Sequence, residues 1–317
     1  MEQQTVERVI LHDLYEAWFL HGRLFSLEEI CGREHWDAEK FWKIVDHLDE
    51  KKHARAVAAG GCYEITPVGI VFAENNGIAD EDLVAKNQRA RTLMLDTLFQ
   101  IREEQVNWVG THYSTLCEKT GLDETIAVYN LQVLEELGYV DEKSGFGERL
   151  TMLGIESIKN YRQRRAIAED FERISDLGPQ PRGRALQVLF AKIVERQGWS
   201  QEEGVRTSNE EIDVIVFKGR EYYLVECKWE KDPIEAGVIR EFYGKLSKRA
   251  GIGGLVVSMS GFTAGAIEEV LEHATSHRIL LFGPEDIHSI VYSKQTFDEM
   301  LNAKSAELTI RKKVLQA

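Results

Sequence analysis

The 317-residue sequence predicts a multidomain α+β protein, with a helical N-terminal half followed by an α/β sandwich with a mixed central sheet. Three observations indicate this fold class. The N-terminal half contains an imperfect repeat, in which helical patterns and a hairpin recur at an offset of 86 residues. A group of prolines and glycines at 176–183 interrupts the chain. Beyond this group, strands alternate with helices, so we expect two or three domains.

Each copy of the repeat, 1–75 and 89–165, has the pattern of a helix, a short helix, a longer helix, a hairpin and a final helix. The longer helix is expected at 37–52 in the first copy and at 123–137 in the second, where apolar residues recur at helical spacing. After the hairpin the offset falls to 85 residues, so one residue is lost where length variation is tolerated.

The run Leu-Glu-Glu-Leu-Gly-Tyr-Val at 134–140 joins the second long helix to its hairpin. Together with the order of elements, this run makes most of residues 5–165 resemble tandem winged-helix domains, at 1–80 and at 83–176 with a long exit helix. The resemblance implies DNA binding through the third helix of each domain. The second candidate recognition helix contains no Arg or Lys, although a DNA reader needs cations. A protein-interaction or dimerisation scaffold is therefore an open alternative.

Two prolines and two glycines between 176 and 183 are expected to end the exit helix. The elements expected beyond them are a helix at 184–197, a hairpin at 210–228, a helix at 234–249, a strand at 254–259, a helix at 263–275, a strand at 278–282 and a helix at 284–291. A helix separates the last two strands, which favours a parallel pair joined right-handedly. This order predicts a third domain at 183–305 and a tail at 306–317.

The expected hairpin at 210–228 brings acidic and basic side chains together. Its two apolar runs flank a three-residue turn centred on Gly219. Reflection about Gly219 places position 213 opposite position 225, so Asp213 is expected beside Glu226, and strand alternation puts Glu226 and Lys228 on one face. Two carboxylates and an ammonium group in apolar surroundings suit a hard divalent cation and a phosphate. The alternative is an ordinary strand in which Glu226 pairs with Lys228 on a solvated face.

Several stretches after residue 183 carry a resemblance to a known family. They lie at 183–186, 212–214, 225–229, 239–245, 257–263 and 279–283. Together they resemble the Mrr-type restriction endonuclease domain, a branch of the PD-(D/E)xK nuclease superfamily, from about residue 183 to residue 291. The resemblance implies a Mg²⁺-dependent endonuclease, with Mn²⁺ as a substitute, that acts on single-stranded or duplex DNA. It further implies a role in restriction or phage defence. We expect a homodimer, because cutting both strands of a duplex usually needs two sites.

The resemblance also implies roles for individual residues. Asp213, Glu226 and the backbone carbonyl of Cys227 are expected to bind the metal, and Lys228 is expected to be catalytic. Gln187 lies at a helix position where many members of the family carry a metal-binding glutamate. Glutamine keeps an oxygen ligand but lacks the charge, so a degenerate nuclease-like adaptor or regulator that only binds nucleic acid or protein is the rival interpretation.

Six further residues are candidates for contact with the substrate because they are basic or hydroxylic and lie near the expected site. They are Lys231, Arg240, Lys245, Lys248, Ser258 and Ser260. Ordinary surface solvation accounts equally well for the basic members of this set.

Charge is unevenly distributed along the chain. The net charge of −14 is unusual for a protein that binds polyanions such as DNA. Residues 1–179 hold 20 Lys and Arg against 33 Asp and Glu, whereas residues 180–317 hold 19 against 20. The acidic half is therefore a candidate surface for a protein partner.

Other features of the sequence predict a cytoplasmic protein without a membrane partner. The four cysteines form no close pair and no zinc-type spacing, which indicates reduced thiols. No run of about 18 apolar residues and no secretion signal is evident.

Overall fold

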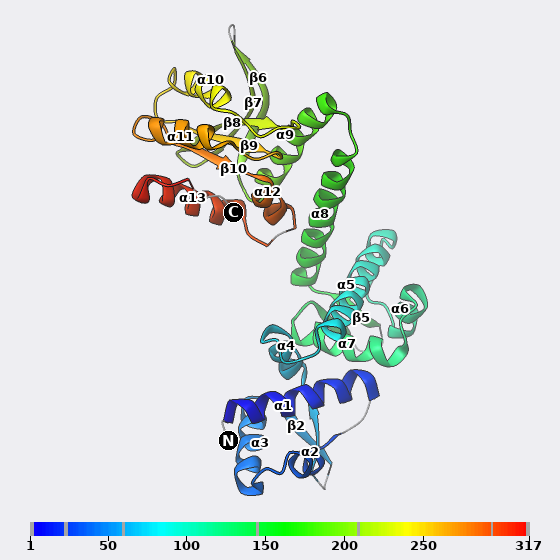
Figure 1. Ribbon diagram of the computed structural model, residues 1–317. Helices are drawn as coiled ribbons and strands as arrows, with labels where there is room; N and C mark the ends of the chain where they lie inside the picture. Colours follow the sequence, from blue (N-terminus) through cyan, green and yellow to red (C-terminus); the bar gives the residue numbers. More distant parts are fainter. Residues whose placement is uncertain are drawn as a thin grey trace. The chain divides into compact units, whose positions relative to one another are not determined.

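The computed structural model describes residues 3–21, 25–58, 61–143, 146–207, 210–292 and 294–314. The chain forms two compact units, Met1–Asn160 and Tyr161–Ala317, which are described separately below (Figure 1). The predicted further division of the first unit into two domains stays a prediction. Among the described residues, none of the helices is long and apolar enough to cross a bilayer.

One order of helices and hairpin occurs twice between residues 3 and 175, with two further short elements in the first copy. The last helix of the second copy begins in the first unit and ends in the second. The first copy consists of α1 (Gln3–Glu16), the π-helical turn η1 (Ala17–His21), β1 (Phe25–Ser26), α2 (Leu27–Arg33), α3 (Ala38–Glu50), β2 (Ala54–Ala58), β3 (Cys62–Ile65) and α4 (Pro67–Asn75). The second copy consists of α5 (Glu81–Glu104), α6 (Tyr113–Thr120), α7 (Glu124–Glu136), β4 (Val140–Lys143), β5 (Gly147–Leu150) and α8 (Met152–Ser175). The strands pair antiparallel, in the order β1-β3-β2 and as the hairpin β4-β5.

The junction between hairpin and final helix is the same in both copies. Thr66 and Thr151 each accept a hydrogen bond through the side-chain oxygen, from the backbone N–H of Gly69 and of Gly154, at 3.1 Å in both cases. A Cβ atom at Gly69 would lie 1.9 Å from a backbone carbonyl oxygen, and one at Gly154 would lie 2.0 Å from its equivalent. Only glycine permits this close approach of helix and hairpin. The repeat predicted from sequence is therefore present in the structure.

A buried polar network joins the two copies. The carboxylate of Glu74 on α4 accepts a hydrogen bond from the hydroxyl of Tyr15 at 2.7 Å and pairs with the Arg91 guanidinium at 2.5 Å. Arg91 also donates to the side-chain oxygen of Asn130 at 3.1 Å, and Asn130 donates to Asn87 at 3.2 Å. Glu74 and Arg91 are less than a tenth exposed. Loss of either partner would leave a buried charge unpaired, which costs roughly 3–5 kcal/mol.

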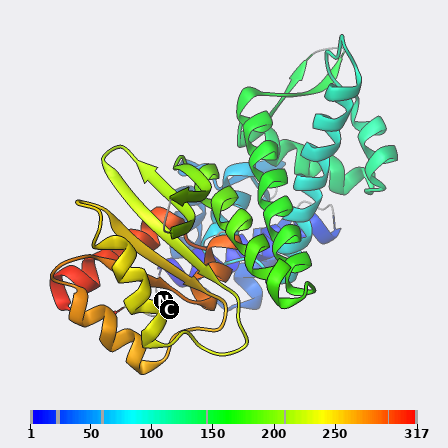
Figure 2. The same cartoon turned by 90° about the horizontal axis from the view of Figure 1, so that it is seen from above.

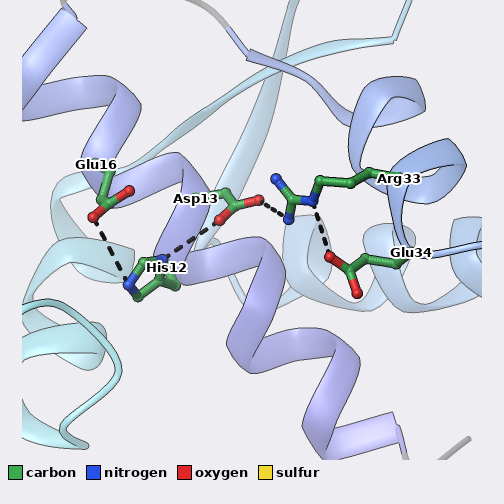
Figure 3. Close-up of polar contacts among 5 residues, drawn as sticks. All are labelled: His12, Asp13, Glu16, Arg33 and Glu34. Atoms are coloured by element: carbon green, nitrogen blue, oxygen red, sulfur yellow. Dashed lines mark hydrogen bonds and ion pairs between the residues drawn. The ribbon is translucent and has the colours of Figure 1, made fainter.

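Ion pairs link α1 and α2 on the surface of the first copy (Figure 3). Arg33 lies between two carboxylates, with 2.6 Å to Asp13 and 2.9 Å to Glu34. His12 lies 3.4 Å from Asp13 and 3.9 Å from Glu16. These pairs are solvent-exposed in part and contribute little to stability. They do, however, neutralise the guanidinium of Arg33 within the protein.

The second unit is built around a five-stranded mixed sheet. Its elements are α9 (Pro179–Arg196), β6 (Ser200–Thr207), β7 (Glu210–Lys218), β8 (Glu221–Lys228), α10 (Ala236–Leu246), β9 (Gly253–Ser258), α11 (Ala264–His273), β10 (Ile279–Phe282), α12 (Pro284–Val291) and α13 (Phe297–Arg311). The strand order is β10-β9-β8-β7-β6, with β8-β9 and β9-β10 parallel and the other pairs antiparallel. Helices lie along both sides of this sheet (Figure 2). The mixed sheet and the parallel pairing of the last two strands are as predicted.

Three elements differ from the prediction. Helix α9 begins at Pro179 and not at residue 184, because both prolines lie in its first turn, where a missing N–H leaves no helical hydrogen bond unmade. Strand β6 was not expected, because its sequence is polar and lacks an apolar alternation. The predicted tail at 306–317 is helical as far as Arg311, as the last part of α13, which starts with a capping box formed by Thr296 and Glu299.

Candidate active site

The candidate active site lies where strands β7 and β8 run side by side. The turn between them has two residues, because Lys218 pairs with Glu221 and Val214 with Val225. The three-residue turn predicted from sequence was wrong, and with it the placement of position 213 opposite position 225. The observed register, continued by one residue, sets Asp213 level with Glu226. Residues level with each other across an antiparallel pair point to the same face, so Asp213, Glu226 and Lys228 share one face of the sheet.

Glu226 is held by two lysines from different elements. Its Oε1 atom lies 2.9 Å from the ammonium nitrogen of Lys228 on the same strand. Its Oε2 atom lies 2.8 Å from the ammonium nitrogen of Lys245 on α10. The side chain of Glu226 is 10% exposed, so both charged contacts form in a largely desolvated environment. A buried carboxylate of this kind requires such partners.

The position of Lys245 depends on a close contact between α10 and strand β9. Phe242 and Leu246 on α10 are buried in the core of the second unit. A Cβ atom on Gly254 of β9 would lie 2.6 Å from carbon atoms of both side chains. The absence of a side chain at Gly254 therefore lets α10 approach the sheet, and Lys245, between these two core residues, reaches the carboxylate of Glu226.

Asp213 is held by the backbone of the neighbouring strand. Its Oδ2 atom accepts a hydrogen bond from the backbone N–H of Cys227 at 2.9 Å. Burial raises the pKa of Asp213, and the charge of Glu226 raises it further. The hydrogen bond from Cys227, the charge of Lys228 and a hydrogen bond with Gln187 oppose this rise. The side chain of Gln187, on helix α9, therefore lies next to Asp213.

The lysines decide the ionisation of Glu226. Burial alone would raise the pKa of Glu226, but the hydrogen bonds from Lys245 and Lys228 outweigh burial and lower it. Burial would lower the pKa of Lys228, but the hydrogen bond to Glu226 and the charges of Glu226 and Asp213 raise it. The raised pKa favours the ammonium form of Lys228, which can donate hydrogen bonds.

A cavity of about 800 Å³ opens beside Asp213 and Lys228. Its described lining includes Asp213, Cys227, Lys228 and Gln187, together with Gln180, Gly183, Arg184, Val188, Glu203, Gly204, Trp229 and Glu230. Sequence reasoning did not assign a role to Gln180 or Arg184. Their spacing from Gln187, of seven and three residues, puts all three on one face of α9, and this spacing could have identified them.

Cys227 contributes its backbone and not its thiol. The side chain is 3% exposed and packs in the core of the unit. Burial raises the pKa of the thiol well above its ordinary value, and the charges of Asp213 and Glu226 act in the same direction. Burial and the raised thiol pKa make this cysteine a poor nucleophile. The predicted use of its carbonyl as a metal ligand stays a prediction.

The six predicted substrate contacts are dispersed. Lys245 pairs with Glu226, whereas Arg240 is exposed and pairs with Glu269 at 2.9 Å. Ser258 is fully buried, lies level with Lys228 in the parallel register of β8 and β9, and donates to a backbone carbonyl at 3.0 Å. The remaining three, Lys231, Lys248 and Ser260, are at least partly exposed. Of the described residues that line the cavity, none belongs to this set.

The oxygen atoms at the site fit a hard divalent cation. Asp213 and Glu226 offer carboxylates, and Gln187 offers a neutral amide oxygen next to Asp213. Among the described residues, no three Asp, Glu, His or Cys side chains are grouped in a way that could hold an ion. Two carboxylates with neutral oxygens suit Mg²⁺, which keeps several of its waters, better than a thiol-seeking metal.

Comparison with known proteins places this site within a recognised domain. Residues 181–291 match the family model Mrr_cat, described as restriction endonuclease. Residues 181–291 of the second unit are therefore similar to the restriction endonucleases that this model describes. No curated protein matches the chain.

Two solved structures show weaker likenesses. One is a protein of unknown function, AF1548, at 18% identity and a TM-score of 0.28, covering 41% of this chain and 88% of that one. The other is protein VC1899 from Vibrio cholerae, at 12% identity and a TM-score of 0.24, covering 66% of this chain and 53% of that one.

Proposed function

We propose that this chain is a metal-dependent DNA endonuclease that hydrolyses phosphodiester bonds through Asp213, Glu226 and Lys228. The observation that carries the proposal is the convergence of these three side chains on one face of β7 and β8, beside a cavity, within a domain that matches restriction endonucleases. We extend this proposal to a role in restriction or phage defence. We also propose a homodimer that cuts both strands and a protein partner for the acidic unit.

The carboxylates of Asp213 and Glu226, with the oxygen of Gln187 and the carbonyl of Cys227, would hold Mg²⁺ or Mn²⁺. A bound ion of this kind polarises a phosphate oxygen and lowers the pKa of a bound water. The hydrogen bond from the Cys227 N–H fixes the carboxylate of Asp213, and Lys245 fixes that of Glu226. Both ligands are therefore preorganised by the fold.

Lys228 supplies positive charge where negative charge develops. Its ammonium group lines the cavity and is 30% exposed, so a phosphate in the cavity can reach it. Because the pKa of Lys228 is raised, the group remains a hydrogen-bond donor across the neutral range. It would donate to the phosphate oxygens as charge accumulates on them.

Cleavage of supercoiled plasmid tests this function. We expect the wild type to nick or linearise plasmid with Mg²⁺ or Mn²⁺ and to lose activity with a chelator. Lys228→Ala should lower the rate by roughly 10²–10³-fold, the usual effect of removing one such donor. Lys218→Ala is the matched control, because Lys218 pairs with Asp298 and lies at the other end of β7. Cleavage that survives Lys228→Ala would contradict the mechanism.

A specific observation favours a second function. Both oxygens of Glu226 are engaged by lysines, and the neutral Gln187 stands beside Asp213. A domain with this arrangement could bind nucleic acid or a protein without cutting, as an adaptor or regulator. Retained DNA binding without cleavage, with both Mg²⁺ and Mn²⁺, would favour this function over the endonuclease.

A further inference from the structure

Arg184 is a cationic side chain of the cavity to which the proposed mechanism assigns no role. It lies on α9, and with Gln180 and Gln187 it lines the cavity from one face of that helix. Leu186 is fully buried in the core of the second unit, which fixes the rotation of α9 and leaves Arg184 exposed. A molecule that enters the cavity therefore meets the guanidinium group of Arg184.

The charges of the cavity make Arg184 important for a polyanion. Among the described residues of the lining, two cations and three carboxylates carry charge: Arg184, Lys228, Asp213, Glu203 and Glu230. An excess of carboxylates repels a phosphodiester except where a cation or a bound metal ion meets it. Lys228 already pairs with Glu226 at 2.9 Å, whereas no ion pair of Arg184 occurs among the residues that the structure describes. Arg184 is therefore the cation of the lining whose charge is not already offset by direct contact with a described carboxylate.

Arg184 lies further from the proposed metal ligands than Lys228 does. Burial is the largest cause of the raised pKa of Asp213, and the charges that shift this pKa are those of Glu226 and Lys228. Arg184 is not among them. On an α-helix, its separation of three residues from Gln187 corresponds to about 4.5 Å along the axis. The guanidinium of Arg184 is thus displaced from the place where Lys228 meets the reacting phosphate.

We propose that Arg184 binds the phosphodiester next to the scissile one, so that the substrate is a strand with at least two consecutive phosphates. Its planar guanidinium donates two parallel hydrogen bonds to the oxygens of that phosphate. Contacts of this kind set the register of the strand and read no base. Arg184 is thus a substrate-binding residue that takes no part in the chemical step. This inference rests on the proposed endonuclease function.

The first measurement is the anisotropy of labelled DNA, as a single strand and as a duplex, with the full chain and Ca²⁺ at several salt concentrations. We expect Arg184→Met to weaken binding by about tenfold or more at low salt, because hydrogen bonds to a charged group are lost. The slope of log affinity against log salt should become shallower by about one. Arg184→Lys keeps the charge without the paired donors and should be intermediate.

Lys192→Met is the matched control for loss of one positive charge. Lys192 lies on the same helix, pairs with Asp170 at 3.0 Å and is not part of the described cavity lining. Its removal should leave DNA affinity near that of the wild type. Methionine retains the apolar stem of the long side chain, and Arg184→Gln serves as a second neutral variant if the first fails to fold.

The second measurement is the kinetics of plasmid cleavage. Arg184→Met should raise KM by about tenfold and lower kcat by less than about threefold, because its contact is equally strong before and during the reaction. Lys228→Ala, in contrast, should lower kcat. A loss of kcat in Arg184→Met as large as that in Lys228→Ala would assign Arg184 to the scissile phosphate and overturn the inference.

The third measurement locates the contact, on a short DNA whose cut has been mapped with the wild type. A neutral methylphosphonate replaces the phosphate on one side of the cut or the other. One of these replacements should weaken binding by the wild type about tenfold and have little further effect on Arg184→Met. Effects that simply add would overturn the inference, as would unchanged DNA affinity in Arg184→Met. Either result, with Lys228-dependent cleavage intact, leaves the endonuclease proposal standing. Absence of cleavage by the wild type with both Mg²⁺ and Mn²⁺ overturns that proposal, and this inference with it.

Discussion

Gln187 places a neutral side chain next to the carboxylate of Asp213. Its side chain forms a hydrogen bond with the carboxylate of Asp213, which lowers the pKa of that group while burial raises it. A glutamate at this position could not donate such a bond when ionised, and two adjacent carboxylates would repel each other. The residue therefore favours an ionised Asp213 and adds no negative charge of its own.

Gln187→Glu should strengthen Mn²⁺ binding in the absence of DNA by about tenfold or more, because it adds one negative charge beside the ligands. It should also raise the pKa of Asp213, so that Mn²⁺ affinity depends more steeply on pH in the acidic range. Calorimetric titration between pH 5 and pH 8 measures both effects. Gln180→Glu adds the same charge on the same cavity wall two helical turns away, and its effect should be smaller. Unchanged affinity in Gln187→Glu would show that position 187 lies outside the metal's reach.

At the scale of elements, the sequence predicted most of the second unit because its apolar runs are strong. The strands and helices between 253 and 291 lie within a few residues of their expected bounds. The hairpin register was missed because a Gly-containing turn of two residues and one of three residues look alike in sequence. The pairing of Lys245 with Glu226 was missed for another reason. It depends on how closely α10 approaches β9, which is a property of tertiary packing and not of local pattern.

The β4-β5 hairpin contains a carboxyl group that should make its stability depend on pH. Burial raises the pKa of Glu148 to about 7, and the charges of Glu135, Glu142 and Asp141 act in the same direction. Its pKa in the folded state thus lies above its unfolded value. Stability is then greatest when the group is protonated and is lost as the pH rises from about 4.5 towards 7.

Glu148→Gln should remove the loss of stability that accompanies ionisation of Glu148 as the pH rises. Because Glu148 is only half-buried, we expect a gain of about 1–2 kcal/mol in local stability at pH 8 and little change at pH 5. Amide hydrogen exchange at Thr111 and Glu148, whose backbones hydrogen-bond to each other at 2.8 and 2.9 Å, reports on this hairpin. Glu142→Gln is the control, because it removes one neighbouring charge and should give a smaller gain. An equal gain at both pH values would argue against ionisation of Glu148 as the cause.

At the scale of the whole molecule, charge separates the two units. Residues 1–160 hold 16 Lys and Arg against 29 Asp and Glu, whereas residues 161–317 hold 23 against 24. Among the described residues of the first unit, several arginines pair with carboxylates of the same unit, including Arg33, Arg55, Arg91 and Arg149. Cations engaged in this way are less available to displace counterions from DNA. The winged-helix interpretation of the first unit stays a prediction, and the negative charge of this unit disfavours binding to a polyanion.

The final prediction therefore concerns the separated units. The core of the second unit draws only on residues beyond 160, so a fragment of residues 161–317 should fold alone. We expect this fragment to bind a DNA duplex at least as tightly as the full chain at low salt, because the −13 charge of residues 1–160 no longer repels the phosphates. The difference should shrink as salt rises, because screening weakens long-range repulsion.

A fragment of residues 1–160 should bind the same duplex far more weakly, with a shallow dependence of affinity on salt. Fluorescence anisotropy at several salt concentrations measures all three proteins, and circular dichroism confirms that each fragment is folded. Binding by the 1–160 fragment that equals the full chain's and falls steeply with salt would assign DNA recognition to the acidic unit. The second unit would then cleave DNA that the first unit binds. The inference that the negative charge of residues 1–160 disfavours DNA binding would be wrong.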